Sequence, residues 1–286
     1  MTKIVLKLLS IIFYRLTGKI ISHKIYGNSI LNSFDVSDKV GIIIQGNIPK
    51  EKKFLLQILH NYRKLYPKVQ IVLSTWVDSD KKVLREINKL NNVKVILNNY
   101  PKYRGIKNIN LQILSTVNAL KYLKNNNFKY ALKTRTDQGI YQYNYNYIEK
   151  FIEIILSKSK LIYSTMNSFS DRHYSISDML MFGNIEDLLV YWDCELDQKR
   201  IKDIKVEKNN RYFMRQGTAE GYLLLEFMKK IKYIPKWSNE CSDFFVQKYF
   251  LSIDYKSLEQ FWFKNDWYIE YSDRHKNIIR SIEFIG

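Results

Sequence analysis

Short apolar runs alternate with amphipathic segments through the first half of the chain. The apolar runs have the length of strands and few polar interruptions, which is typical of strands buried on both faces of a sheet. They cover residues 39–48, 70–76 and 93–97 and a run that begins at Tyr130. The segments 52–66, 80–90 and 108–125 repeat apolar residues at helical spacing. This alternation predicts an α/β fold with a Rossmann-like, mostly parallel sheet flanked by helices.

The second half of the chain has a more mixed pattern. It predicts helices at 143–156, 185–192 and 218–230 and strands at 161–166 and 178–182. The last helix begins with Thr218 as N-cap and ends in lysines, which are favourable at those positions. Residues 199–211 are charged and predict a loop. We interpret the aromatic and charged tail from Trp262 as a cover for a cleft.

The amino-terminal residues 2–21 predict an amphipathic basic helix, with lysines and one arginine on one side and aliphatic residues on the other. Charges interrupt it too often for a membrane span. Two interpretations remain: a helix lying in an anionic membrane interface, which we favour, and a helix packed on the protein's own core. We assign residues 1–30 to this segment, as a membrane-surface anchor, and residues 38–286 to a single domain.

Composition and charge narrow the class of protein. The chain has 286 residues, 46% of them hydrophobic, and a formal net charge of +18. A charge of this size favours anionic partners such as phosphate-rich substrates or an anionic membrane. Nucleic acid is not expected, because the lysines are scattered and no nucleic-acid-binding module is recognisable. The two cysteines, Cys194 and Cys241, lie far apart and are expected to be reduced inside the cell.

The segment YALKTRTDQ at 130–138 begins as a buried strand and ends in charges. Alternation on a strand would place Lys133, Arg135 and Asp137 on one face. Such a group is costly to bury without partners, so we consider two explanations: a ligand cleft at the strand end, and a local ion-pair network. Ligands of α/β sheets bind at the carboxyl ends of strands. Neither GxGxxG nor GxxxxGK[ST] occurs, which argues against ordinary dinucleotide enzymes and P-loop ATPases.

Five motifs, taken in order, resemble the WavE-type lipopolysaccharide-synthesis family of glycosyltransferases. The motifs are LSTW at 73–76, NINLQILSTVNALK at 108–121, YALKTRTDQ at 130–138, SDMLMFG at 177–183 and TAEGYLLLEF at 218–227. The resemblance covers roughly residues 38–280. It implies a GT-A-like fold and transfer of a sugar from a nucleotide-sugar to a lipopolysaccharide or other cell-surface glycan. The chain departs from the pattern at Leu111, where the family favours Arg, and at Arg135, where GT-A enzymes carry the first acid of DxD.

The resemblance implies a donor site whose diphosphate must be neutralised, by a metal, by cations or by both. One option is that Asp137 holds Mg²⁺ or Mn²⁺ with help from the substrate. The other is that Arg135 and Lys133 bind the diphosphate directly while Asp137 orients the donor sugar. The predicted donor-binding residues are Gln45, Gly46, Thr75, Trp76, Lys107, Asn110, Arg135 and Asp137.

Two carboxylates compete for the role of general base toward the acceptor hydroxyl. Asp178 begins an apolar run, where an ionised carboxylate is unexpected unless it has a function. We therefore favour Asp178 as the general base. Glu220 lies in the first turn of a predicted helix, where an acid also complements the helix dipole.

The leading hypothesis is a glycosyltransferase that works in the cytoplasm, peripherally at the inner face of the plasma membrane. Its partners would be a nucleotide-sugar, a glycan or glycolipid acceptor and the anionic membrane surface. The alternatives are a nucleotidyltransferase or other nucleotide-sugar enzyme, and a non-catalytic module that binds a membrane surface or polyanion.

Overall fold

A computed structural model describes residues 20–21, 25–26, 33–36, 39–50, 52–168, 173–174, 176–198 and 218–263. The predicted α/β alternation is confirmed along the first half of the body. In chain order the elements are β3 (Val40–Gln45), α2 (Lys52–Leu65), β4 (Gln70–Trp76), α3 (Lys81–Ile87), β5 (Val93–Asn98), the 3-10 turn η1 (Ile106–Asn108), α4 (Ile109–Asn125) and β6 (Tyr130–Arg135).

The second half supplies the remaining strands and helices of the body. They are β7 (Gln138–Ile140), α5 (Tyr147–Lys158), β8 (Leu161–Ser164), β9 (Met181–Asn184), α6 (Ile185–Trp192), α8 (Ala219–Lys230), α9 (Asn239–Tyr249), β10 (Phe250–Ile253) and β11 (Gln260–Trp262). Four of these had no counterpart in the predictions: β7, α9, β10 and β11. The three strands are only three or four residues long, too short for a periodic pattern to identify them.

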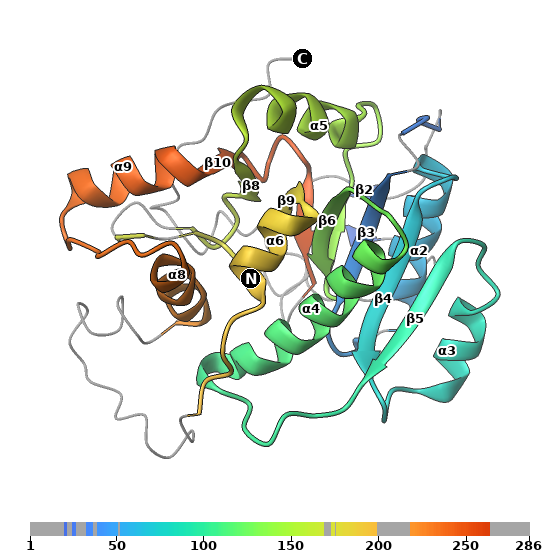
Figure 1. Cartoon of the computed structure of the whole chain (residues 1–286). Coiled ribbons are helices and arrows are strands. Elements are labelled where there is room, and N and C mark those ends of the chain that lie inside the picture. The colour runs from blue at the N-terminus through green and yellow to red at the C-terminus, as the bar shows by residue number, and fades with distance from the viewer. Residues whose placement is uncertain are drawn as a thin grey trace, which may run out of the picture.

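Seven strands form the central sheet, in the order β10-β8-β9-β6-β3-β4-β5 (Figure 1). All neighbours in this sheet pair in parallel except β9, which runs antiparallel to both β6 and β8. The mostly parallel sheet that the alternation predicts is thus confirmed. The order reverses at β3, because β4 and β6 lie on opposite sides of it, and ligands of open α/β sheets bind at such a point.

Helices cover both faces of the sheet, as the near-continuous apolar strands predict (Figure 1). Alternate residues of β3 enter different cores: Ile42 and Ile44 pack with α2, α3 and α5, whereas Ile43 packs with α4, α6, α8 and α9. This division follows from the two-residue period of a strand. The central strands of the sheet are therefore buried on both faces, whereas the edge strand β5 exposes Lys94 and Leu97.

The amino-terminal segment is described only at two short strands, β1 (Ile20–Ile21) and β2 (Ile25–Tyr26), which pair antiparallel. The last two residues of the predicted helix thus form a strand, and residues 2–19 lie outside the described residues. The same is true of the predicted loop at 199–211 and of the tail after residue 263. The helix, the loop and the boundaries 1–30 and 38–286 stay predictions.

Candidate active site

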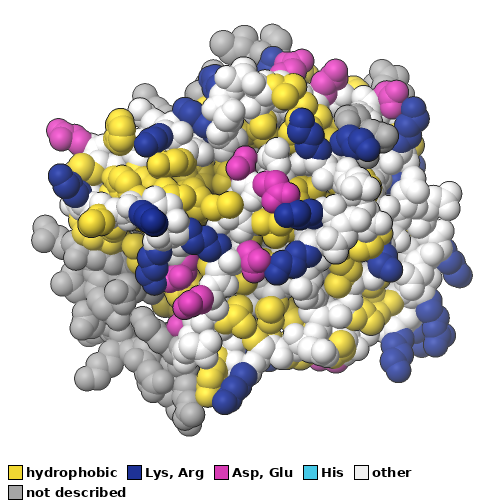
Figure 2. Space-filling view, in the orientation of Figure 1, with side chains coloured by type: hydrophobic (Ala, Val, Ile, Leu, Met, Phe, Trp, Pro, Cys, Tyr) yellow, Lys and Arg dark blue, Asp and Glu magenta, His cyan; other side chains and the backbone are white. Residues whose placement is uncertain are grey.

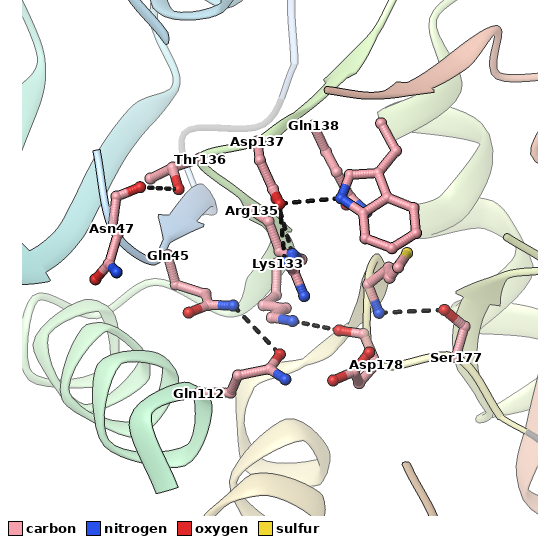
Figure 3. A network of polar contacts seen from close by, with 12 residues as sticks. Gln45, Asn47, Gln112, Lys133, Arg135, Thr136, Asp137, Gln138, Ser177 and Asp178 are labelled. Carbon is pink, nitrogen blue, oxygen red and sulfur yellow. Dashed lines mark hydrogen bonds and ion pairs between the residues drawn. The ribbon is translucent and has the colours of Figure 1, made fainter. Parts of the chain in front are cut away.

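A cavity of about 590 Å³ opens at the carboxyl ends of β3 and β6. Its lining comes from residues 45–50 after β3, Trp76 at the end of β4, residues 107–108 and 111–112 at the start of α4, residues 135–137, and Phe263. Six of the predicted donor-binding residues are among them: Gln45, Gly46, Trp76, Lys107, Arg135 and Asp137. The polar network beside this cavity is drawn in Figure 3.

The ends of β3 and β6 are locked together on one side of the cavity. Register pairs Gln45 with Arg135, and the Thr136 amide donates to the Gln45 carbonyl at 3.0 Å. The Thr136 hydroxyl donates to the Asn47 carbonyl at 2.5 Å. Gly46 turns between them at a φ of 125°, where an added Cβ would lie 3.0 Å from the Thr136 hydroxyl. A side chain at position 46 would thus be strained, so the turn requires glycine.

The start of α4 reaches the cavity through an unusual backbone. Lys107 and Asn108 both have positive φ, 48° and 64°, and Asn108 caps α4 without a side-chain hydrogen bond. Non-glycine residues in this region store strain that the surrounding structure must support, and such strain is frequent at functional sites. The conformation brings Lys107 and Gln112 to the cavity wall.

Asn110 and Thr75 were predicted in the donor site but do not line this cavity. The buried Asn110 amide donates to the carbonyls of Tyr103 and Asp197 at 2.9 and 2.8 Å and accepts from the Asp197 amide at 2.8 Å. It therefore holds the loop before α4. The Thr75 hydroxyl is buried and shares a 2.8 Å hydrogen bond with the Ser79 hydroxyl. Both residues are buried, and neither lines the cavity.

Gln45 and Trp76 lie at the cavity with most of their surface buried. The side-chain oxygen Oε1 of Gln45 accepts from the Ser115 hydroxyl at 2.9 Å, which orients the side-chain amide toward α4. Trp76 is 1% exposed and stacks on Tyr100 with ring centroids 4.7 Å apart. An indole covered in this way offers an edge to a ligand and little of its face.

Arg135 and Asp137 form a bidentate ion pair at the cavity. Arg135 Nε donates to Asp137 Oδ1 at 2.8 Å, and Arg135 Nη2 donates to Oδ2 at 2.9 Å. Trp262 Nε1 donates to the same Oδ2 at 2.9 Å. The indole arrives there because β11 pairs with β7. Sequence reasoning missed Trp262 as a site residue, and its only signal was the aromatic character of the tail.

Lys133 does not face the cavity with Arg135 and Asp137. Its side chain is fully buried, and its ammonium donates to the Asp178 carbonyl and lies 4.5 Å from the Trp192 ring centroid. Burial lowers the pKa of Lys133 to about 7, and the nearby Asp178 charge opposes that shift. Lys133 lies on the buried part of β6, whereas Arg135 and Asp137 lie at or just after its carboxyl end. The alternation that places the three charged residues on one face therefore does not predict the surroundings of each side chain.

The two candidate bases, Asp178 and Glu220, lie near Lys133 and Arg135 but do not line the cavity. Asp178 is 2% exposed and precedes β9, and its Oδ2 has no hydrogen-bond partner among the described residues. Glu220, in the first turn of α8, accepts a hydrogen bond from the Asn167 side chain. Both carboxylates favour the charged forms of Lys133 and Arg135, so the structure brings them close to these cations.

The described residues contain neither a group of metal ligands nor a helix that could span a membrane. Within the described part of the chain, no three His, Cys, Asp or Glu side chains form a group that could hold a metal ion. Of the described helices, none combines the length and hydropathy required to cross a bilayer.

The solved structures that match this chain have low sequence identity to it and low TM-scores. HddC from Yersinia pseudotuberculosis, complexed with GMP-PN, is 18% identical, with 62% of this chain and 87% of that chain covered and a TM-score of 0.36. The TarS 1–349 structure from S. aureus is 12% identical, with coverage of 57% and 52% and a TM-score of 0.39. A cytidylyltransferase from Leptospira borgpetersenii serovar Hardjo-bovis is 16% identical, with coverage of 73% and 94% and a TM-score of 0.36.

Sequence comparison is more informative. No curated protein matches the chain. A family profile described as WavE lipopolysaccharide synthesis matches residues 40–251. The matched range runs from the first residue of β3 into β10 and includes the charged strand end, both candidate bases and every cavity-lining residue except Phe263.

Proposed function

Because the chain belongs to the WavE lipopolysaccharide synthesis family, we propose that it is a glycosyltransferase that moves a sugar from a nucleotide-sugar to a lipopolysaccharide or other cell-surface glycan. The observation that carries this proposal is the charge of the cavity. Its described lining holds three cations, Lys50, Lys107 and Arg135, and a single carboxylate, Asp137, which is already paired. Such a lining attracts an anionic ligand, and the donor diphosphate is one.

The donor would bind with its diphosphate against these cations. They would also stabilise the negative charge that grows on the diphosphate as it leaves, which is the larger part of the catalytic task. The side-chain amides of Gln45 and Gln112 meet at the same wall and offer hydrogen bonds to the nucleoside. Because the pair is oriented by Ser115, little reorganisation is required on binding.

In the transfer step the acceptor hydroxyl oxygen attacks the anomeric carbon of the donor sugar. The bond from that carbon to the diphosphate oxygen breaks, and its electron pair leaves with the diphosphate. The hydroxyl proton passes to a carboxylate, for which we propose Asp178, with Glu220 as the alternative. Asp178 Oδ2 has no hydrogen-bond donor within the described part of the chain, which supports this choice because a buried carboxylate oxygen without a donor is otherwise unfavourable.

A lipid-linked acceptor would lie in a membrane. We therefore propose that the protein works in the cytoplasm at the inner face of the plasma membrane, bound peripherally. The net charge of +18 supports an attraction to anionic lipid.

The test of the reaction is donor binding followed by product analysis. Calorimetric titration with UDP-, GDP- and CMP-sugars should yield one donor that binds, and incubation with acceptor glycan should release free nucleotide as the glycan lengthens. Asp178→Asn should lower kcat at least about 100-fold, whereas Glu153→Gln, an exposed carboxylate on α5, should leave kcat unchanged.

Three results would contradict parts of the proposal. Release of pyrophosphate from a nucleoside triphosphate and a sugar phosphate would identify a nucleotidyltransferase. Full activity in cells with Asp178→Asn and Glu220→Gln combined would favour a non-catalytic module. Loss of kcat in Glu220→Gln alone would transfer the role of base to Glu220.

A further inference from the structure

Both oxygens of the Asp137 carboxylate are already hydrogen-bonded. Oδ1 accepts from Arg135 Nε, and Oδ2 accepts from Arg135 Nη2 and Trp262 Nε1, all at 2.8 to 2.9 Å. The Asp137 backbone is held as well, since its carbonyl accepts from the Phe263 amide at 2.7 Å. Asp137 thus joins the end of β6 to the strand β11, and its side chain is directed at Arg135 (Figure 3).

The ion pair keeps both partners charged. Burial alone would raise the pKa of the Asp137 carboxyl, but the charge and hydrogen bonds of Arg135, together with the Trp262 hydrogen bond, hold that pKa below its ordinary value. Burial alone would lower the pKa of Arg135, and Asp137 raises it above its ordinary value. The pair therefore stays ionised across the range in which an enzyme works.

A divalent metal is a poor match for this arrangement. To coordinate a metal, Asp137 would have to give up hydrogen bonds to Arg135 or Trp262, and the metal would lie beside the like-charged guanidinium. A hard cation also prefers several oxygen ligands, and no group of three acidic, His or Cys donors exists among the described residues. The described donor set does not fit Mg²⁺ or Mn²⁺, although it stands at the position of an acidic motif.

Arg135 itself still has donors to offer. A guanidinium carries five N–H groups, and Asp137 takes two of them. Among the contacts of the described residues, the other three have no protein partner, and Arg135 lines the cavity. The Trp262 ring centroid lies 5.8 Å from Arg135 Cζ, which further restricts the guanidinium. A planar fork fixed in this way is suited to phosphate oxygens.

We propose that Asp137 is a positioning residue for Arg135, and that the guanidinium held by Asp137 and Trp262 binds the donor diphosphate in place of a divalent metal. This inference rests on the proposed function, because it requires a nucleotide donor in the cavity. Lys50 and Lys107 line the same cavity and supply further positive charge to the diphosphate.

The experiment is calorimetric titration of the full chain with UDP, GDP, ADP and CDP, first in EDTA and then in Mn²⁺. The nucleotide that binds should do so with Kd values that agree within about 3-fold in the two conditions. Arg135→Ala should weaken its binding at least about 10-fold in both. Arg135→Lys keeps the positive charge but lacks the planar guanidinium with its several N–H donors. It should therefore bind the nucleotide more tightly than Arg135→Ala but less tightly than wild type. Arg85→Ala on the exposed side of α3 is the control and should bind as wild type.

Asp137→Asn separates positioning from metal coordination. The amide keeps an oxygen for the indole N–H but loses the charge, so nucleotide binding should weaken by the same factor in EDTA and in Mn²⁺. Electron paramagnetic resonance of Mn²⁺ titrated into wild type and Asp137→Asn should show the same low binding in both. Circular dichroism establishes that each variant is folded.

Two outcomes would overturn the inference, and they are distinguishable. If a nucleotide binds only with Mn²⁺, and Asp137→Asn abolishes Mn²⁺ binding, Asp137 is a metal ligand and the proposed transferase function survives. If none of the nucleotides binds in either condition, while the nucleotide-sugars also fail, the proposed function fails together with the inference.

Discussion

Lys133 illustrates what happens to a charged residue near the end of a buried strand. Its neighbours on the same face, Arg135 and Asp137, line the cavity. Lys133 lies earlier on the strand than Arg135, and its side chain is buried in the core. Its ammonium is held by the Asp178 carbonyl and the Trp192 ring. These contacts compensate a part of the desolvation cost, and the lowered pKa reports the remainder.

This lowered pKa predicts a pH-dependent stability. Folded Lys133 releases its proton near pH 7 and the unfolded lysine near 10.5. Between these values the unfolded state binds more protons, so the free energy of unfolding rises with pH. Urea unfolding from about pH 7 to about pH 9 should show wild type gaining roughly 2 kcal/mol relative to Lys133→Met. Equal slopes for the two proteins would show that Lys133 is not the group responsible.

Asp178 and Asn110 differ in how far their side chains are hydrogen-bonded. Both are buried polar residues. Asn110 has hydrogen-bond partners for its side-chain oxygen and nitrogen, whereas the residues that the structure describes offer none to Asp178 Oδ2. Satisfied polar groups in a core are structural as a rule, and an unsatisfied one requires another explanation. Sequence alone does not separate these cases, since each residue lies at the edge of an apolar run.

At the scale of elements, the most consequential feature is the short strand β11. It pairs with β7, the strand that directly follows the charged end of β6. The pairing places Phe261 against Phe54 and Tyr141, with ring centroids 6.4 Å apart in each case. It also places Trp262 on Asp137. A strand of three residues is thereby connected both to the core and to the site.

We expect the core contact of β11 to be worth more than its length suggests. Phe261→Ala should lower the free energy of unfolding by about 3 kcal/mol, because it removes a buried ring and leaves a cavity. The control is Phe244→Ala on α9, which is 64% exposed and should change stability by less than about 0.5 kcal/mol. Denaturant unfolding of both variants checks the prediction, and equal effects would mean that β11 contributes little to the core.

At the scale of the whole molecule, the net charge of +18 comes from lysines and arginines scattered along the sequence. On the face drawn in Figure 2, lysines and arginines are spread over the surface with acidic residues among them. A diffuse excess attracts an anionic surface without defining a specific docking site, and the attraction falls with salt.

The proposed membrane partner can be tested at this scale. The full chain should sediment with vesicles that contain phosphatidylglycerol at low salt and be released at high salt, because the attraction to anionic lipid is screened. Vesicles of phosphatidylcholine alone are the control and should bind weakly. Binding to both vesicle types that persists at high salt would indicate insertion of apolar residues and not charge.

The α/β class and the parallel body of the sheet follow from the sequence alone. Alternating apolar runs and amphipathic segments have few other stable solutions, because each strand must be covered on both faces. The same reasoning predicts a candidate site where carboxyl strand ends converge at one edge. Gln45, Arg135 and Asp137 do line one cavity there, and their roles in binding a donor stay predictions.

Tertiary structure decided which side chains reach the cavity and which support it. Contacts between segments far apart in sequence bury Lys133, bind the Asn110 side chain to the Asp197 carbonyl and place Trp262 on Asp137. A local pattern records the face on which a side chain lies, but not its depth or the partner brought by another segment. For this reason Asp137 reads as half of a metal motif in the sequence and as the partner of Arg135 in the folded chain.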